Sequence, residues 1–175
     1  MFIPGQLISA ATFPGVIVHE TAHMFFCKLR KVAIFDVKFF QFGDPAGYVI
    51  HEATEDFTST FLISMGPFFI NTVLCFLICF PAFFPISYFE IDQPLSYFLM
   101  WFGLSIGMHA IPSNQDAKNI WDQAKTEVKS MNMLAIASFP IVAIIYVFNL
   151  LRFFWADLIY GGIIGIGIPS LIFNS

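Results

Sequence analysis

The residues best suited to do chemistry lie in one short stretch, His19-Glu20-Thr21-Ala22-His23. On a helix, two histidines four residues apart face the same side one turn from each other, so both imidazoles can bind one zinc ion. Glu20 lies about 100 degrees around the helix from His19, where its carboxylate can reach a zinc-bound water as a general base without displacing either ligand. The spacing therefore predicts a zinc site with Glu20 as the catalytic residue.

The stretch lies in an apolar run, where a carboxylate is unfavourable. Insertion scales give a cost of about 2.5 to 3.5 kcal/mol for an acidic side chain at the centre of a membrane helix. Glu20 therefore needs a compensating partner or a function. The alternative to a metal site is a buried cluster of His and Glu side chains that ties helices together by hydrogen bonds.

A catalytic zinc usually has three protein ligands, so a third must come from elsewhere in the chain. Asp116 is the candidate, because it follows a later apolar run whose cytoplasmic end is predicted to lie in the same leaflet as His19 and His23. Its alternative role is to cap the helix that follows. Other side chains compete for the position: Cys27, His51, Glu52 and His109. Cys27 is excluded because it lies about 12 Å along the helix from His19.

Two polar residues are candidates for substrate binding, Asn71 and His109. Asn71 follows Gly66-Pro67 in an apolar helix, where its amide could bind a substrate main chain, stabilise an oxyanion or form an interhelical hydrogen bond. His109 could be a metal ligand, a polar group near the substrate or an interhelical residue, and the last two roles are favoured over the first. We expect both residues to lie near the substrate.

Composition places these residues in a membrane protein. The chain is 58% hydrophobic and 11% charged, with a mean hydropathy of +0.77, whereas soluble domains are about half apolar and a quarter charged. Apolar stretches cover roughly residues 4–27, 58–86, 94–112, 134–152 and 156–173, and the last, short and glycine-rich, could be re-entrant. The sequence predicts a mainly α-helical bundle of about five membrane segments. It forms a single domain, 1–175, with a core over 4–117 and C-terminal helices over 134–173.

The basic residues indicate the orientation, because seven of the eight Lys and Arg residues lie in two polar segments. The positive-inside rule makes both segments cytoplasmic, puts the active site toward the cytoplasmic side and leaves only Arg152 at the far face. In the first polar segment, VAIFDVKFFQF and GYVIHE flank the turn 43–47, which predicts a β-hairpin over 34–52 at the membrane surface.

The same composition limits the partners. No basic stripe with spaced aromatic residues is present, so nucleic acid is not an expected partner. The expected partners are the lipid bilayer and a membrane-protein or peptide substrate, and a homo-oligomer is left open. We expect an integral, multi-pass protein of the cell or inner membrane.

Taken together, the motifs resemble the site-2 protease family of intramembrane zinc metalloproteases. The likeness covers roughly residues 4–117 and rests on HETAH on an early helix, a Gly-Pro-containing helix with Asn71, and a proline-containing segment ending in Asp116. The resemblance implies that Asp116 completes the zinc site and that the hairpin is similar to the family's membrane-edge strands that hold substrate. The chain has His109-Ala-Ile-Pro112 and Asp116-Ala117 where the family typically has Asn-x-x-Pro and Asp-Gly, and its Asn71 lies one residue further from Gly-Pro, so it resembles a divergent branch.

The sequence thus leads to the expectation of a zinc-dependent endopeptidase that hydrolyses a peptide bond in or near a transmembrane segment. His19, His23 and Asp116 would hold one zinc ion per chain, and Glu20 would take a proton from its water and pass it to the leaving amine. The substrate would unwind and pair with an edge of the hairpin. The alternatives are a metal-binding membrane transporter, an HExxH enzyme that cuts peptides at the membrane surface, and a catalytically silent scaffold.

Overall fold

The computed structural model describes residues 5–88 and 93–174, which are mainly helical. The α-helices are α1 (Gly5–Ala11), α2 (Phe13–Leu29), α3 (Phe57–Tyr88), α4 (Pro94–Met108), α5 (Asn114–Glu127), α6 (Met133–Leu151), α7 (Ala156–Gly162) and α8 (Ile168–Asn174). Shorter turns of 3-10 helix, η1 (Val128–Ser130) and η2 (Arg152–Phe154), and of π-helix, η3 (Ile163–Gly167), connect some of them. The strands are β1 (Ile34–Lys38) and β2 (Tyr48–His51). The predicted mainly helical fold is confirmed.

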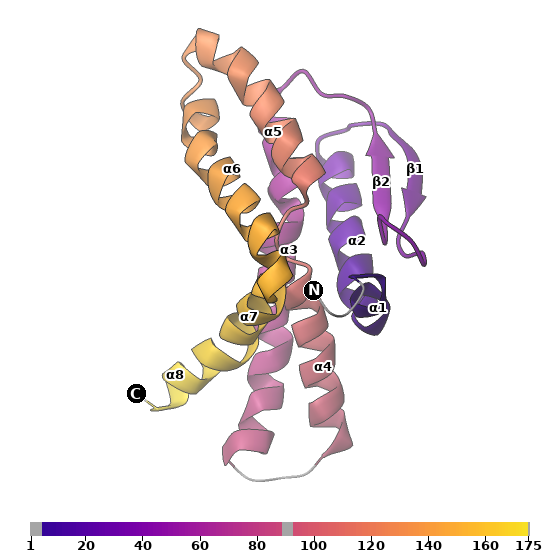
Figure 1. Ribbon diagram of the computed structural model, residues 1–175, viewed down its shortest axis with the longest axis vertical. Coiled ribbons are helices and arrows are strands. Elements are labelled where there is room, and N and C mark those ends of the chain that lie inside the picture. The colour runs from indigo at the N-terminus through magenta and orange to yellow at the C-terminus, as the bar shows by residue number, and fades with distance from the viewer. Residues whose placement is uncertain (1–4, 89–92, 175) are drawn as a thin grey trace.

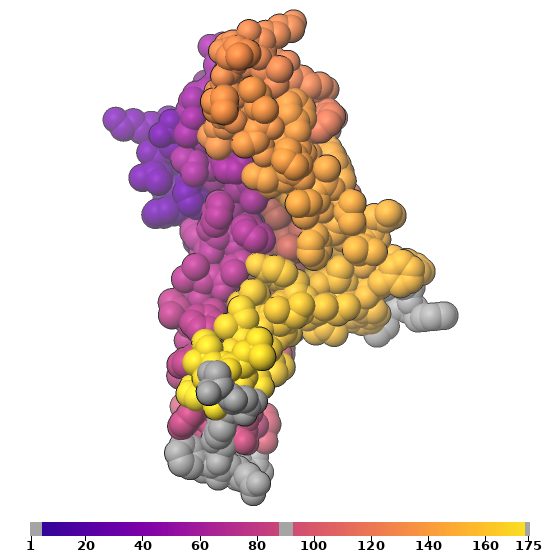
Figure 2. Space-filling model, turned by 90° about the vertical axis from the view of Figure 1, so that its left-hand side faces the viewer, coloured from indigo at the N-terminus to yellow at the C-terminus, as the bar shows by residue number. Residues whose placement is uncertain are grey.

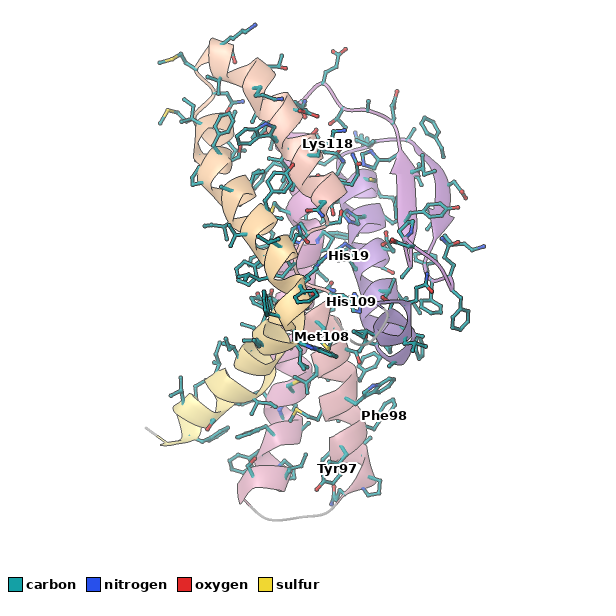
Figure 3. All side chains as sticks on the ribbon, viewed as in Figure 1. His19, Tyr97, Phe98, Met108, His109 and Lys118 are labelled. Atoms are coloured by element: carbon teal, nitrogen blue, oxygen red, sulfur yellow. The ribbon has the colours of Figure 1, made fainter. Side chains whose placement is uncertain are left out.

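Helix α3 is the axis of the molecule and runs along most of its length (Figure 1). Helices α2, α5 and α6 and the hairpin surround its first half, and α4, α7 and α8 lie along its second half. In Figure 3, Lys118 lies toward one end of the long axis and Phe98 and Tyr97 toward the other, with His19 and His109 between them. The HETAH stretch therefore lies midway along the molecule, where the two halves meet.

Three helical stretches among the described residues are candidates to span a membrane: Phe57–Ser87, Met133–Phe154 and Ala156–Phe173. Pro94–Met108 is apolar but shorter. The first predicted run is not among these stretches: it is divided at Thr12 into α1 and α2, and α2 has 17 residues, several of them polar. The part of the chain that the structure describes thus includes three helices long and apolar enough to cross a bilayer, which supports membrane association.

Small residues let α3, α4 and the α7–η3 segment approach closely. A Cβ added at Gly107 would lie 2.6 Å from the Cys75 sulfur and 3.0 Å from the Gly161 Cα, distances that no real side chain tolerates without movement. Each of the three segments carries two small residues four positions apart: Cys75 and Cys79, Gly103 and Gly107, Gly161 and Gly165. This is the pattern by which membrane helices pack in the absence of a hydrophobic driving force. Figure 2 shows the C-terminal helix lying across α3, so this segment is part of the packed bundle.

The predicted hairpin forms over β1 and β2, which pair antiparallel with Lys38 opposite Tyr48 and Ile34 opposite His51. A cross-strand hydrogen bond from the Tyr48 hydroxyl to an Asp36 oxygen, 2.9 Å long, supports this register. The hairpin packs along α2, with β2 bordering the space between α2 and α5 (Figure 1). The prediction of a hairpin after the first helix is confirmed, and its second strand lies beside HETAH.

One predicted placement is wrong. Arg152 was expected at the face opposite the cytoplasmic ends of the first and third apolar runs, yet its Nη2 donates a hydrogen bond to the carbonyl of Ile111, 3.0 Å away, directly after α4. The reason is that α6 returns only to the middle of α3, so its last turn meets the link between α4 and α5 (Figure 1).

Candidate metal centre

The two histidines of α2 are oriented by main-chain carbonyls. His19 Nδ1 lies 2.6 Å from the carbonyl oxygen of His109, and His23 Nδ1 lies 2.9 Å from that of Ile63. A carbonyl oxygen can only accept, so each Nδ1 carries the proton and donates it. Each neutral imidazole therefore presents an unprotonated Nε2, the tautomer that a metal ligand requires.

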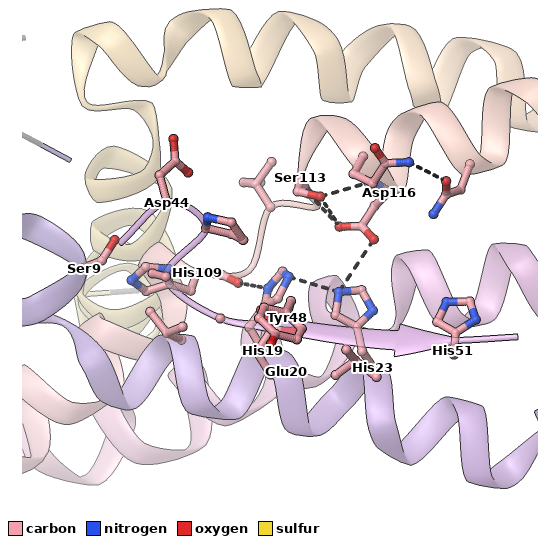
Figure 4. A pocket seen from close by; sticks show the side chains of 18 of the residues that line it. Ser9, His19, Glu20, His23, Asp44, Tyr48, His51, His109, Ser113 and Asp116 are labelled. Carbon is pink, nitrogen blue, oxygen red and sulfur yellow. Dashed lines mark hydrogen bonds and ion pairs between the residues drawn. The ribbon is translucent and has the colours of Figure 1, made fainter. Parts of the chain in front are cut away.

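The two Nε2 atoms face each other 3.2 Å apart (Figure 4). With both Nδ1 atoms protonated, neither neutral ring has a proton left to donate across this gap, so two lone pairs converge on one space. Such an arrangement is unfavourable unless a positive charge lies between the nitrogens. The helical spacing of HETAH thus places two unprotonated nitrogens where they could bind one cation.

The two carboxylate oxygens of Asp116 have different neighbours. Oδ2 accepts hydrogen bonds from the backbone N–H and the hydroxyl of Ser113, at 2.9 and 2.6 Å, while the Asp116 N–H donates to the Ser113 Oγ at 3.1 Å. This reciprocal arrangement is a capping box that begins α5. Oδ1 points the other way and lies 3.6 Å from His23 Nε2. The N-cap role considered for Asp116 therefore belongs to Ser113, and one oxygen of Asp116 faces the histidines.

His19, His23 and Asp116 together form a group that could hold a metal ion. Their ligand atoms all lie within 4.8 Å of one another, and His23 and Asp116 are buried. The competing side chains Cys27, His51, Glu52 and His109 are not part of this group. Cys27 is fully buried one helical turn beyond His23, and the His51 Nδ1 bonds the carbonyl of Glu52.

Glu20 is buried next to these ligands, with 7% of its surface exposed. It lines the same cavity of about 390 Å³ as the three ligand residues. No side chain or backbone group in the described residues forms a hydrogen bond or ion pair with its carboxylate. The Glu20 side chain packs against the hairpin instead, where a Cβ added at Gly47 would lie 2.8 Å from the Glu20 Cγ. The carboxylate is thus shielded from solvent and available for a proton transfer.

Strand β2 borders the central cavity and one of its two neighbours, and the turn of the hairpin borders the other. The central cavity is lined by Gly47, Tyr48, Val49 and His51 on the hairpin side. A cavity of about 500 Å³ shares Val49 and His51 with it, and one of about 560 Å³ shares Asp44 and His109. Among the described residues β2 pairs only with β1, so its other edge is free for a further strand. The three cavities therefore lie along β2 and the turn that precedes it, with the metal group at the central one.

The two residues predicted near substrate occupy different positions. Asn71 is fully buried away from the cavity, and its Nδ2 donates to the carbonyls of Ile106 and His109 at 3.2 and 3.1 Å, which is the interhelical role left open by the sequence. His109 lines the cavity, and its Nε2 lies 2.8 Å from the Thr12 hydroxyl.

Sequence reasoning missed several residues of this region. Ser113 could have been found, because Ser-x-x-Asp before a helix is a capping signal. Gly47, Asn149 and Arg152 have no such signal, since their contacts are made across the fold.

The geometry shows a group of His19, His23 and Asp116 that could hold a metal ion, with the buried Glu20 lining the same cavity. Comparisons of this chain with known protein families, with curated proteins and with solved structures find no match.

Proposed function

We propose that the protein is a zinc-dependent endopeptidase of the membrane, resembling the site-2 proteases, with about five membrane segments and its active site toward the cytoplasmic side. The observation that carries this proposal is the convergence of two unprotonated imidazole nitrogens and one carboxylate oxygen beside the unengaged carboxylate of Glu20. A purely structural polar cluster would pair these groups with donors instead of directing them at one another.

Zinc fits the donor set and its spacing. With bonds of about 2.0 to 2.1 Å in a tetrahedral arrangement, neighbouring ligand atoms lie about 3.3 Å apart. The distance between the two Nε2 atoms is 3.2 Å, and that from His23 Nε2 to Asp116 Oδ1 is 3.6 Å. Two nitrogens and one oxygen leave the fourth position open, as in catalytic zinc sites.

The residues of the chain have separate roles in the proposed reaction. Bound zinc supplies an activated water and polarises the scissile carbonyl. Glu20 accepts the proton of the attacking water and returns it to the leaving amine, which its free carboxylate allows. The carbonyls of His109 and Ile63 hold the two imidazoles in the required tautomer, and the capping box holds Asp116.

The hairpin supports a role in substrate binding. A peptide bond within a helix is shielded by its hydrogen bonds, so the substrate must be extended before it is cut. The free edge of β2 can pair with such a segment by strand addition. The cavities beside β2 and beside the turn that precedes it provide space for the substrate side chains. His109 lines two of these cavities and is the residue best placed to contact the substrate near the reacting bond.

A membrane transporter of metal ions would also use the two histidines. It has no need of a buried carboxylate that lines the same cavity as the ligands and has no hydrogen-bond or ion-pair partner among the described residues, and this feature favours the protease.

The test is zinc content and peptide cleavage, measured on the detergent-solubilised chain and the Glu20→Gln variant. We expect the wild type to hold about one zinc ion and to cut a transmembrane test peptide. The variant should keep its zinc and lose about 10²- to 10⁴-fold in turnover, the contribution of a general base. Glu52→Gln is the matched control, because Glu52 is exposed and outside the metal group, and it should retain full activity. A wild type that holds no zinc after metal loading would overturn the proposal.

A further inference from the structure

The link between α4 and α5, residues 109–113, carries much of the metal group's support. Its first carbonyl holds His19, and its last residue begins the helix that presents Asp116. The link is not helical, so its carbonyls lack the partners that a helix would supply. It is also buried: Ala110 is 0% and Ile111 4% exposed. Such carbonyls are costly unless another part of the chain donates to them.

Two of these donors come from the last turn of α6 and from the first residue of η2, directly after it. The Asn149 Nδ2 donates to the carbonyl of Pro112 at 3.1 Å, and the Arg152 Nη2 donates to the carbonyl of Ile111 at 3.0 Å. Asp157 holds the Arg152 guanidinium from the other side, with 3.0 Å between Nε and Oδ2. Two consecutive carbonyls, directly before the capping box of Asp116, are thus fixed by a helix that was expected to lie outside the catalytic core.

Two donors at the end of α6 restrict the backbone of the link more than either donor alone. The hydrogen bonds to the carbonyls of Ile111 and Pro112 fix the backbone before Ser113. Ser113 in turn holds the Asp116 carboxylate by a hydrogen bond. The distance between Asp116 Oδ1 and His23 Nε2 therefore depends on where the end of α6 lies.

We propose that Asn149 and Arg152 are positioning residues for the metal centre, so that α6 is a functional part of it. Neither belongs to the metal group, although Arg152 also lines the central cavity, and both hold the backbone from which Asp116 is presented. The inference rests on the proposed zinc site. Groups that orient metal ligands without binding the metal themselves typically contribute 10- to 100-fold to metal affinity.

The experiment is a zinc titration against a competing chelator, on the full chain in detergent. The variants are Asn149→Leu, which keeps the approximate volume and removes the donor, and Arg152→Met. Matched controls are Ser138→Ala, a buried polar residue of α6 that bonds only within its own helix, and Arg30→Met, which breaks an Arg–Asp pair far from the link. We expect the two α6 variants to bind zinc 10- to 100-fold more weakly and the controls to bind within threefold of the wild type.

Cobalt provides a readout that a general loss of stability does not move. The visible absorption of the folded, cobalt-loaded protein reports the geometry of the ligands, and we expect it to change in both α6 variants, whatever the unfolding temperature of the metal-free proteins, and to stay unchanged in the two controls. Arg152→Lys should recover part of the affinity, because the ammonium can still donate to Ile111. If Asn149→Leu does not fold, Asn149→Gln, with its amide one methylene further out, carries the same test.

The outcomes separate the two proposals. A wild type that binds zinc, together with α6 variants of unchanged affinity and unchanged cobalt spectrum, would overturn the positioning role alone. A wild type that binds no metal would overturn the proposed function, and the positioning role with it.

Discussion

Replacing Gly47 by alanine tests whether the hairpin holds Glu20 in its reactive position. A Cβ at this position would lie 2.8 Å from the Glu20 Cγ and 3.0 Å from the carbonyl oxygens of Lys38 and Phe39. Carbon atoms in ordinary contact lie about 3.5 to 4.0 Å apart, so Glu20 or the hairpin must move by about 1 Å. A misplacement of about 1 Å can cost about 100-fold in rate.

We therefore expect Gly47→Ala to lower kcat about 100-fold. Zinc content should stay unchanged, because the added methyl group would meet Glu20 and the hairpin backbone and none of the three ligands. The assay is single-turnover cleavage of a transmembrane test peptide, with elemental analysis of zinc on the same preparation.

Gly43→Ala is the matched control in the same loop. Its Cβ would meet nothing closer than 3.9 Å, and neither glycine has a positive φ, so the backbone tolerates alanine at both positions. We expect this control to cleave at the wild-type rate. If Gly47→Ala were as active as Gly43→Ala, the reasoning that places Glu20 against the hairpin as the base would be refuted.

Three further outcomes are expected. Gly107→Val should lower the free energy of unfolding by about 1 to 3 kcal/mol, because a Cβ there would lie 2.6 Å from a buried sulfur, whereas Gly162→Val, with open space around its Cβ, should unfold at the wild-type temperature. Hydrogen bonds from Ser59 and Arg30 hold the pKa of Asp56 below its usual value. This carboxylate therefore stabilises the fold above the ordinary Asp pKa and loses that effect as the pH falls through the lowered value. Asp56→Asn should reduce the acid dependence of the unfolding temperature, and an unchanged dependence would contradict this. Removing zinc with a chelator should lower the unfolding temperature reversibly, since free zinc at about 100 times its Kd stabilises by about 2.7 kcal/mol, and a temperature indifferent to zinc would argue against the site.

The part of the site that could be predicted from sequence is the part that depends on local geometry. His19 and His23 share a face because a helix repeats every 3.6 residues, and any helix through HETAH has this property. The hairpin could be predicted from alternating β-branched and aromatic residues around a glycine-rich turn. Asp116 could be reached because the basic segments indicated that its helix begins at the same level as the histidines.

What could not be predicted depends on distances across the fold. The end of α6 reaches the link before Asp116 because α6 ends level with the middle of α3. Hydropathy shows that α6 is apolar, but it carries no information on where along α3 the helix ends. For the same reason Arg152 was expected at the wrong level. The sequence also could not show that Asn71 is withdrawn from the cavity, since an amide in an apolar helix satisfies either role.

Both ligand histidines are held by main-chain oxygens, of His109 and Ile63. Every amino acid supplies that oxygen, so no single substitution can delete either acceptor, and an alanine scan of metal binding would pass over both positions. The orientation of the two imidazoles thus depends on the path of the backbone at His109 and Ile63, whatever side chains those positions carry. Substitutions at either position that keep the backbone path can therefore leave both ligand nitrogens directed at the same space.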